Sequence, residues 1–165
     1  MSLTAQTIAA RLNEKFGAKI LETNLEAVDP YCRIAPEAIA EVALFCRDAL
    51  GFDYLACLSG VDYMDKKKTS TELGVVYHLQ SLRDAKPRFC LKVRLGRENP
   101  SLPTVENVWR TADWHEREAW DMFGIVFEGH HNLTRILCAE DWEGHPLRKD
   151  YVSPDTYHGI KNNVV

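Results

Sequence analysis

The sequence lacks the short motifs that hold common cofactors. The cysteines are odd in number and no two of them form a Cys-x-x-Cys pair, which excludes a local zinc ribbon or iron–sulfur motif. No glycine-rich dinucleotide or phosphate loop is present. We therefore expect no cofactor, metal or catalytic group in this chain, and free thiols in a reducing cytoplasm. The cysteines are Cys32, Cys46, Cys57, Cys90 and Cys138.

Long apolar runs and an excess of basic residues are also missing. No stretch approaches the roughly 20 apolar residues that cross a bilayer, and residues 1–16 read as neither a signal peptide nor a membrane anchor. The net charge of -4 does not favour a nucleic-acid partner. A chain of 165 residues without internal repeats fits one domain, with or without a tail.

Two segments have helical periodicity. Apolar residues recur at every fourth position in residues 4–16, which is one face of a helix. A second helix is predicted between Pro36, which suits a first helical position, and Gly51, which suits a stop.

Five segments have strand patterns. In chain order they are residues 18–26, 30–34, 52–60, 71–82 and 88–95. The third is apolar on both faces, so we expect it to lie centrally. The last two are predicted to form a hairpin closed by residues 83–87, and the last alternates strictly between apolar and polar residues. The fold class predicted is α+β: a two-layer sandwich with a mostly antiparallel or mixed sheet and helices on one face.

Cationic side chains line the polar face of the last strand. Arg88, Lys92 and Arg94, with Arg97 beyond, form a stripe of one sign. The stripe either faces solvent or meets an acidic partner protein. The charged segment at residues 65–70 is predicted to be a solvated loop.

Residues 116–137 hold four carboxylates, two arginines and two adjacent histidines around an aromatic run. A helix is predicted to begin with a capping box between Asp113 and Glu116 and to stop at Gly124. Glu116 falls on an aromatic stripe, so it should be either neutral or paired. Arg117 and Asp121, at positions i and i+4, are predicted to pair.

Three hypotheses account for this concentration of reactive residue types. A metal could bind His115 and Glu118 with His130 and His131, although the order reverses the Glu-x-x-His of di-iron sites and occurs once. Glu116 beside His130 could form an acid–base pair, although no nucleophile motif stands nearby.

The third hypothesis is a structural ionic cluster, and it is our prediction. Arginines at three positions would bind the acids and fix the following segment in one register. The acids are Glu116, Glu118 and Asp121, and the arginines are Arg117, Arg135 and Arg148.

The remaining chain has no helical or strand period, yet it carries large apolar groups. Trp142, Leu147, Tyr151 and Tyr157 lack a regular element to bury them. We expect them to pack on the domain or on a partner chain, because aromatic and arginine anchors are favoured at interfaces. The predicted organisation is an α+β domain over residues 1–137 and an extended docking tail over residues 138–165.

Two stretches within residues 114–151 carry a family resemblance. "EREAWDMFGIVFEGH" with the following "RIL", and then "WEGHPLRKDY", resemble the two signatures of the thirty-kilodalton (C-type) subunit family of respiratory complex I, the proton-pumping NADH:quinone oxidoreductase. The residues that fit are Glu116, Arg117, Glu118, Asp121, Met122, Phe123, Gly124, Phe127, His130, Leu133, Arg135, Ile136, Leu137, Gly144, His145, Pro146, Leu147, Arg148, Lys149 and Asp150. His131, Asn132 and Thr134 depart from the usual Pro, Asp and Arg, which suggests a divergent lineage.

The resemblance implies a cofactor-free core subunit of the peripheral arm. Its partners would be the quinone-site (D-type) subunit and the iron–sulfur subunits, and FMN and Fe-S clusters in partner subunits would carry electrons from NADH to quinone, coupled to proton translocation. It implies a position on the cytoplasmic side of the inner (plasma) membrane, attached through the complex. An alternative is the equivalent subunit of an energy-converting membrane-bound hydrogenase or formate hydrogenlyase. A stand-alone acid–base or metal enzyme is the third possibility.

Overall fold

The first helix forms where the fourfold apolar spacing places it. The computed structural model describes residues 3–67, 71–83 and 88–161. Helix α1 spans Ala5–Phe16, and a capping box between Thr4 and Thr7 satisfies its first backbone donors. It buries Ile8 and Leu12 in the core. A 3-10 turn, η1 (Gly17–Lys19), leads into the sheet.

The second predicted helix is also confirmed. It begins with a 3-10 turn, η2 (Pro36–Ala38), and continues as α2 (Ile39–Asp48). Its buried face contains Ile39, Val42 and Cys46. Gly51, with φ of 71°, lies beyond its last turn and redirects the chain toward the sheet.

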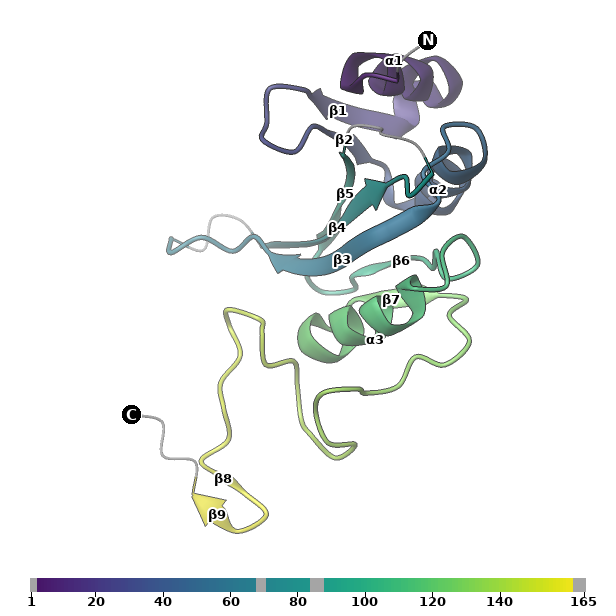
Figure 1. Ribbon diagram of the computed structural model, residues 1–165. Helices are drawn as coiled ribbons and strands as arrows, with labels where there is room; N and C mark the ends of the chain where they lie inside the picture. The colour runs from purple at the N-terminus through teal and green to yellow at the C-terminus, as the bar shows by residue number, and fades with distance from the viewer. Residues whose placement is uncertain (1–2, 68–70, 84–87, 162–165) are drawn as a thin grey trace.

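The main sheet has five strands in the order β1-β2-β5-β4-β3 (Figure 1). They are β1 (Ile20–Asn24), β2 (Tyr31–Ile34), β3 (Tyr54–Asp62), β4 (Glu72–Gln80) and β5 (Phe89–Gly96). All neighbours are antiparallel except β2 and β5, which run parallel. The predicted mixed sheet is therefore confirmed, as is the pairing of β4 with β5. The segment predicted to close that hairpin falls largely on residues 84–87, outside the described residues.

The prediction that residues 52–60 form a central strand was wrong. Among the described residues, strand β3 pairs with β4 alone and so lies at the edge of the sheet. The central position belongs to β5, which pairs with β4 on one side and with β2 on the other. Leu55 and Leu58 are nevertheless buried, since α3 packs on this strand. Packing against a helix gave β3 the apolar character expected of a central position.

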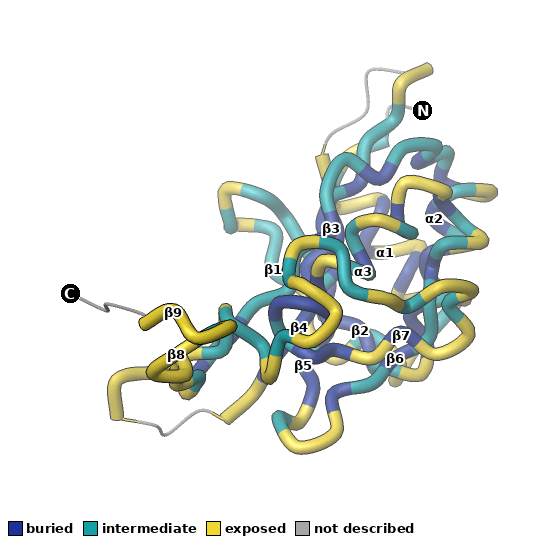
Figure 2. The backbone as a smooth tube through the Cα atoms, turned by 90° about the horizontal axis from the view of Figure 1, so that it is seen from below, coloured by how far each residue is buried: buried dark blue, intermediate teal, exposed yellow. Residues whose placement is uncertain are grey.

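One face of the sheet holds the core. Along β5, Phe89, Leu91 and Val93 are fully buried, and Leu91 pairs with the buried Tyr77 of β4. The same core includes apolar residues of all three helices, so the helices cover one face, as predicted. Figure 2 shows the buried segments gathered in the body of the domain and the exposed ones concentrated toward the C-terminal tail.

On the opposite face, the predicted cationic stripe is divided. Lys92 lies 3.6 Å from the centroid of the Tyr31 ring, and Arg94 lies 3.2 Å from that of Tyr63. Arg97 turns away into an ion pair with Asp62. Lys92 and Arg94 thus pack against aromatic rings, and Arg97 is nearly buried. The four cations therefore do not form one continuous positive surface.

A smaller unit follows the sheet. Strand β6 (Ser101–Pro103) and strand β7 (Val126–Glu128) are parallel, and α3 (Ala112–Phe123) connects them. The chain beyond β7 is irregular except for a hairpin of β8 (Thr156–Tyr157) and β9 (Ile160–Lys161), which the sequence did not predict. Figure 1 shows this segment looping below α3. The predicted loop at residues 65–70 falls partly on residues 68–70, outside the described residues.

None of the helices among residues 3–67, 71–83 and 88–161 has the length and apolar character of a membrane span.

Candidate functional site

The predicted capping box at the start of α3 does not form. Thr111 occupies the N-cap position, but its hydroxyl points to the Leu55 carbonyl at 3.4 Å and does not cap the helix. The Glu116 carboxylate instead faces the chain that precedes the helix, where it accepts hydrogen bonds from the Thr104 hydroxyl and, at 2.8 Å, from the Val105 N–H. The prediction failed because residues 104 and 105 supply donors that compete with the helix's own first turn.

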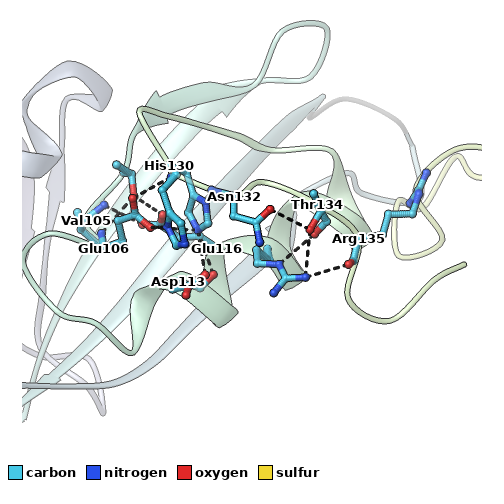
Figure 3. Close-up of polar contacts among 11 residues, drawn as sticks. Val105, Glu106, Asp113, Glu116, His130, Asn132, Thr134 and Arg135 are labelled. Carbon is cyan, nitrogen blue, oxygen red and sulfur yellow. Dashed lines mark hydrogen bonds and ion pairs between the residues drawn. The ribbon is translucent and has the colours of Figure 1, made fainter. Parts of the chain in front are cut away.

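Glu116 is fully buried, and its carboxyl group is hydrogen-bonded to the Val105 N–H (Figure 3). Its pKa is raised to about 7: burial is the largest cause, Glu106 and Asp113 also raise it, and the two hydrogen bonds lower it. No arginine pairs with it among the described residues. Of the two states predicted for Glu116, the structure therefore supports the hydrogen-bonded acid rather than the ion pair.

Asp121, also fully buried, organises the chain that follows β7. Its Oδ1 forms an ion pair of 2.5 Å with Arg135. Its Oδ2 accepts three backbone N–H bonds, from Ile136 at 3.0 Å, Leu137 at 2.8 Å and Cys138 at 2.9 Å. Burial alone would raise the pKa of Asp121, but these donors outweigh it and hold the pKa at about 2. The carboxylate is thus a charged anchor for four consecutive residues.

Arg117 does not pair with Asp121, contrary to the sequence prediction. Its guanidinium donates to the Thr134 carbonyl at 3.2 Å, the Thr134 hydroxyl at 3.1 Å and the Arg135 carbonyl at 3.1 Å. Both side chains reach across to residues 134–138 instead of toward each other. Helical spacing brought them close, but it could not show what the later segment offers.

The second signature stretch caps the C-terminal end of α3. Helices end with carbonyls that lack intrahelical partners. Here the Asp121 carbonyl accepts from His145 Nδ1 at 3.0 Å, the Met122 carbonyl from the Leu147 N–H at 3.1 Å, and the Phe123 carbonyl from Arg148 Nε at 2.6 Å. The guanidinium is also favourably placed at the negative end of the helix dipole.

Gly124 makes this arrangement possible. It ends α3 with φ of 70°, a left-handed conformation that favours glycine. A Cβ at this position would lie 2.5 Å from the His145 ring and 2.8 Å from Arg148 Nη2. The absence of a side chain therefore admits the two residues that cap the helix.

A third anchor was missed by sequence reasoning. Asp62, at the end of β3, pairs with Arg97 and accepts the Lys149 N–H at 2.8 Å, while Arg97 also binds Asp150 at 2.8 Å. Lys149 Nζ donates to the Met64 carbonyl at 2.6 Å. The only sequence signal for this anchor was an acid, Asp62, at the end of an apolar strand. Its partners Arg97 and Lys149 lie 35 and 87 positions away, so the sequence did not indicate them.

The predicted ionic cluster is therefore correct in one pair and wrong in the others. Asp121 and Arg135 form it, whereas Glu116 binds neutral donors and Arg148 binds a carbonyl. Glu118 is exposed and has no arginine partner among the described residues. The segment is held in register, as predicted, but mainly by carboxylate-to-amide and side-chain-to-carbonyl bonds.

The residues proposed for a metal separate into two places. His115 and Glu118 line a small cavity beside Gly60. His130 and His131 lie elsewhere, stacked with ring centroids 5.3 Å apart. Their ring nitrogens and the carboxylates of Glu106 and Asp113 all lie within 4.8 Å of one another, which is a grouping that the sequence did not predict.

The hydrogen bonds of His130 do not suit a metal ligand. Its Nδ1 accepts the Asn132 N–H at 3.1 Å, so Nε2 carries the proton and points to the Asp113 carbonyl at 3.2 Å (Figure 3). A ligating imidazole usually donates through its second nitrogen, and here that nitrogen accepts. Neither does His130 bond to Glu116, so the proposed acid–base pair is not formed. His131 Nδ1 lies 2.7 Å from Glu106, which raises the pKa of His131.

A family model and individual relatives match the sequence of this chain. A family model described as "Respiratory-chain NADH dehydrogenase, 30 Kd subunit" matches residues 32–157. The matched residues include both signature stretches, together with Asp62 and Asp121.

The chain belongs to this family. Two members of the 30 kDa subunit family, both named as the C-type subunit of NADH-quinone oxidoreductase, are similar to it over 153 residues, or 91% of the chain. The protein of Chlorobium phaeobacteroides is 48% identical and is covered over 90% of its length. That of Chloroherpeton thalassium is 47% identical, and the chain spans 62% of its length.

A solved structure has a similar fold. "Nqo5 of the trypsin-resistant fragment (1-134) in P63 form" superposes with a TM-score of 0.64 at 34% identity, covering 76% of this chain and 99% of that one. The family resemblance and the α+β fold predicted from the sequence are thereby confirmed, as is membership of a family of oxidoreductase subunits.

The departures from the 30 kDa subunit signature make contacts of their own. His131 binds Glu106 through both its N–H, at 2.9 Å, and its ring. Thr134 receives Arg117 through its hydroxyl and its carbonyl. The turn that leads from His130 to Arg135 is therefore held by local contacts of the residues at these positions.

Proposed function

We propose that this chain is a structural subunit of the peripheral arm of an NADH:quinone oxidoreductase. In this role it holds neighbouring subunits in position and carries no reacting group itself. The FMN and Fe-S clusters that pass electrons from NADH to quinone, and the coupling to proton translocation, belong to the partner subunits. The names of its relatives, which are subunits of NADH-quinone oxidoreductase, support this assignment.

The observation that carries the proposal is how residues 135–150 are held. Polar groups of this segment turn inward onto Asp121, Asp62 and the end of α3. Large apolar side chains of this segment are exposed, Leu137 at 65% and Leu147 at 54%, as is Val152 just beyond it at 84%. Anchored backbone with outward apolar groups is what a docking surface requires.

Some of the tail aromatics, which were predicted to pack on the domain or on a partner, pack against each other. The rings of Trp142 and Tyr157 lie 5.1 Å apart, and the Tyr157 hydroxyl donates to Asp141 at 2.9 Å. Trp142 Nε1 and the Tyr151 hydroxyl are buried without a hydrogen-bond partner among the described residues. We infer that residues 138–165 form the docking tail, which contacts the quinone-site (D-type) subunit and an iron–sulfur subunit.

The proposed location is peripheral, on the cytoplasmic side of the inner (plasma) membrane. Attachment then depends on the other subunits, because the chain supplies binding surface rather than a lipid-embedded element. Washing membranes at high salt should release the chain together with its partners and not alone.

Affinity purification of the tagged full chain from its native cells tests the proposal. The expected result is co-purification of the quinone-site subunit and iron–sulfur subunits, identified by mass spectrometry. A chain truncated after Cys138 should remain folded yet recover none of them. Recovery of the full chain free of partners would contradict the proposed function.

The same purification separates the alternative complexes. An energy-converting hydrogenase or formate hydrogenlyase would supply a nickel-containing large subunit in place of an NADH-binding module. The names of the relatives favour the NADH enzyme. A stand-alone metal enzyme would instead show stoichiometric zinc or iron in the isolated chain by elemental analysis.

A further inference from the structure

A cavity of about 440 Å³ opens beside the C-terminal end of α3. The residues that matter among its lining are Glu98, Ser101, Gly124, Val126, His145 and Arg148. His145 and Arg148 each donate one hydrogen bond, through Nδ1 and Nε, to a carbonyl of α3, and these bonds fix both side chains in place. Their remaining nitrogens are available to the cavity.

Arg148 lacks an anion. Its Nε binds the Phe123 carbonyl, but in the described part of the chain no carboxylate lies within ion-pair distance of its guanidinium. Asp62 and Asp150, two acids whose charges act on Arg148, are both engaged by Arg97. Burial, followed by the charge of Arg97, lowers the pKa of Arg148 below its usual value. Asp150 and Asp62 act on Arg148 only at longer range, so the free protein leaves this partly buried cation without a direct ion pair.

His145 adds an acceptor. Its Nδ1 lies 3.0 Å from the Asp121 carbonyl, which can only accept, so Nδ1 carries the proton and Nε2 presents a lone pair. Nε2 has no hydrogen-bond partner among residues 3–67, 71–83 and 88–161. The cavity therefore combines a planar donor fork with one neighbouring acceptor.

We propose that this cavity receives a carboxylate side chain from a partner polypeptide, bound by Arg148 through two N–H groups, while His145 Nε2 accepts an N–H of the same segment. The inference rests on the proposed function, which supplies the partner. Arginine and carboxylate match in a bidentate geometry that lysine cannot reproduce. Val126 is 41% exposed and Leu147 54%, so apolar surface adjoins the polar cavity, as at interface anchors.

A lipid or free phosphate fits the cavity less well. Its oxygens would face the lone pair of His145 Nε2 and the exposed carboxylate of Glu98. A peptide segment brings backbone N–H donors beside its carboxylate, which suits His145. Glu98 makes no ion pair with Arg148 among the described residues and so leaves the donor fork open.

The test uses the assembled complex. Arg148→Lys keeps the positive charge but replaces the fork with an amine, which a carbodiimide couples to an adjacent carboxylate as an amide. The expected product, found by mass spectrometry, joins position 148 to an Asp or Glu of a partner subunit. Arg110→Lys, at an exposed arginine on another face, is the matched control and should give no such product.

Affinity measurements complete the test. Arg148→Gln should weaken retention by the partner subunits on the order of tenfold to a hundredfold, and Glu98→Gln should leave it equal or stronger. Thermal unfolding of each free variant controls for folding, and the Arg148→Lys cross-link carries the test if Arg148→Gln does not fold.

Other results overturn the inference. Cross-links from position 148 that reach only Glu98 or other acids of this chain would do so, as would wild-type retention of Arg148→Gln. Loss of binding to vesicles containing anionic lipid, with partner affinity unchanged, would reassign the cavity to lipid. A wild-type chain that fails to co-purify at all would refute the proposed function and this inference together, whereas the preceding outcomes leave the proposed function standing.

Discussion

Asp121 and Arg135 meet at 2.5 Å in the interior of the protein, and the same carboxylate receives the N–H groups of the three residues that follow Arg135. One side chain on α3 thus fixes both the charge and the backbone of the incoming tail.

Asp121→Asn should destabilise the chain by about 3 kcal/mol, because it leaves Arg135 without its anion and sets an NH2 group against backbone donors. The free energy of unfolding in urea at pH 7 measures this. Asp113→Asn, which changes a partly exposed acid on the same helix, is the matched control and should have a much smaller effect.

Acid should weaken the same anchor. The pKa of Asp121 is about 2 in the folded chain and roughly 4 when unfolded, so its contribution is complete above pH 4 and is lost as the pH falls toward 2. Unfolding midpoints measured between pH 6 and pH 2.5 should fall more steeply for the wild type than for Asp121→Asn. Parallel pH curves would show that folding does not lower the pKa of Asp121 and would contradict the anchor.

Glu116 should give the opposite pH dependence. Its pKa rises from roughly 4 in the unfolded chain to about 7 in the folded one, so the folded state holds the proton more tightly. Wild-type stability should therefore decline, relative to Glu116→Gln, as the pH rises from 4 to 7 and then level off. At pH 4 we expect the Gln variant to be less stable by about 1 kcal/mol, since the Thr104 hydroxyl loses its acceptor. A pH-independent difference between the two proteins would refute the assignment.

Gly124→Ala tests the space that admits the tail. The variant should lose about 1 to 2 kcal/mol from left-handed backbone strain and more from the displacement of His145 and Arg148. Gly159→Ala is the matched control, because its φ is +78° and nothing lies within 4 Å of the added Cβ. Urea unfolding together with tryptic cleavage after Arg148 should separate the two. Equal losses would mean that the tail does not depend on Gly124.

Thiol accessibility provides a simple check of the fold. Cys32, Cys46 and Cys90 are buried, and burial raises the pKa of each thiol, that of Cys90 to about 11. Iodoacetamide at pH 8 should modify Cys57 and Cys138 first and the buried three only on unfolding. Mass spectrometry at timed intervals identifies the order, and early alkylation of Cys46 would contradict the α2 packing.

The helices and strands with a regular apolar period were predicted from the sequence. Contacts between residues far apart in the chain were missed. The apolar spacing in α1 and the alternation along β5 each reflect one element facing one core, so both were recovered. The edge position of β3 was not, because a helix can bury a strand as well as a neighbouring strand can.

The charged residues illustrate the same limit. Asp121 and Arg135 were identified as partners within a larger set, but Arg117 was misassigned because helical spacing describes only its own helix. Asp62 and Arg97 were missed altogether, since neither the strand nor the basic stripe indicates what the tail will bring to them.

Between Gly124 and the residues that cap the helix, the chain forms strand β7 and then an irregular stretch, 129–144, that returns to the end of α3. Arg117 and Asp121 also fasten residues 134–138, so the pieces between fixed points are short, and doubling a short flexible loop costs only about 0.6 kcal/mol in closure entropy. Lineages of this family could therefore lengthen or shorten the loop to suit a different neighbour while the clasp at the end of α3 remains unchanged.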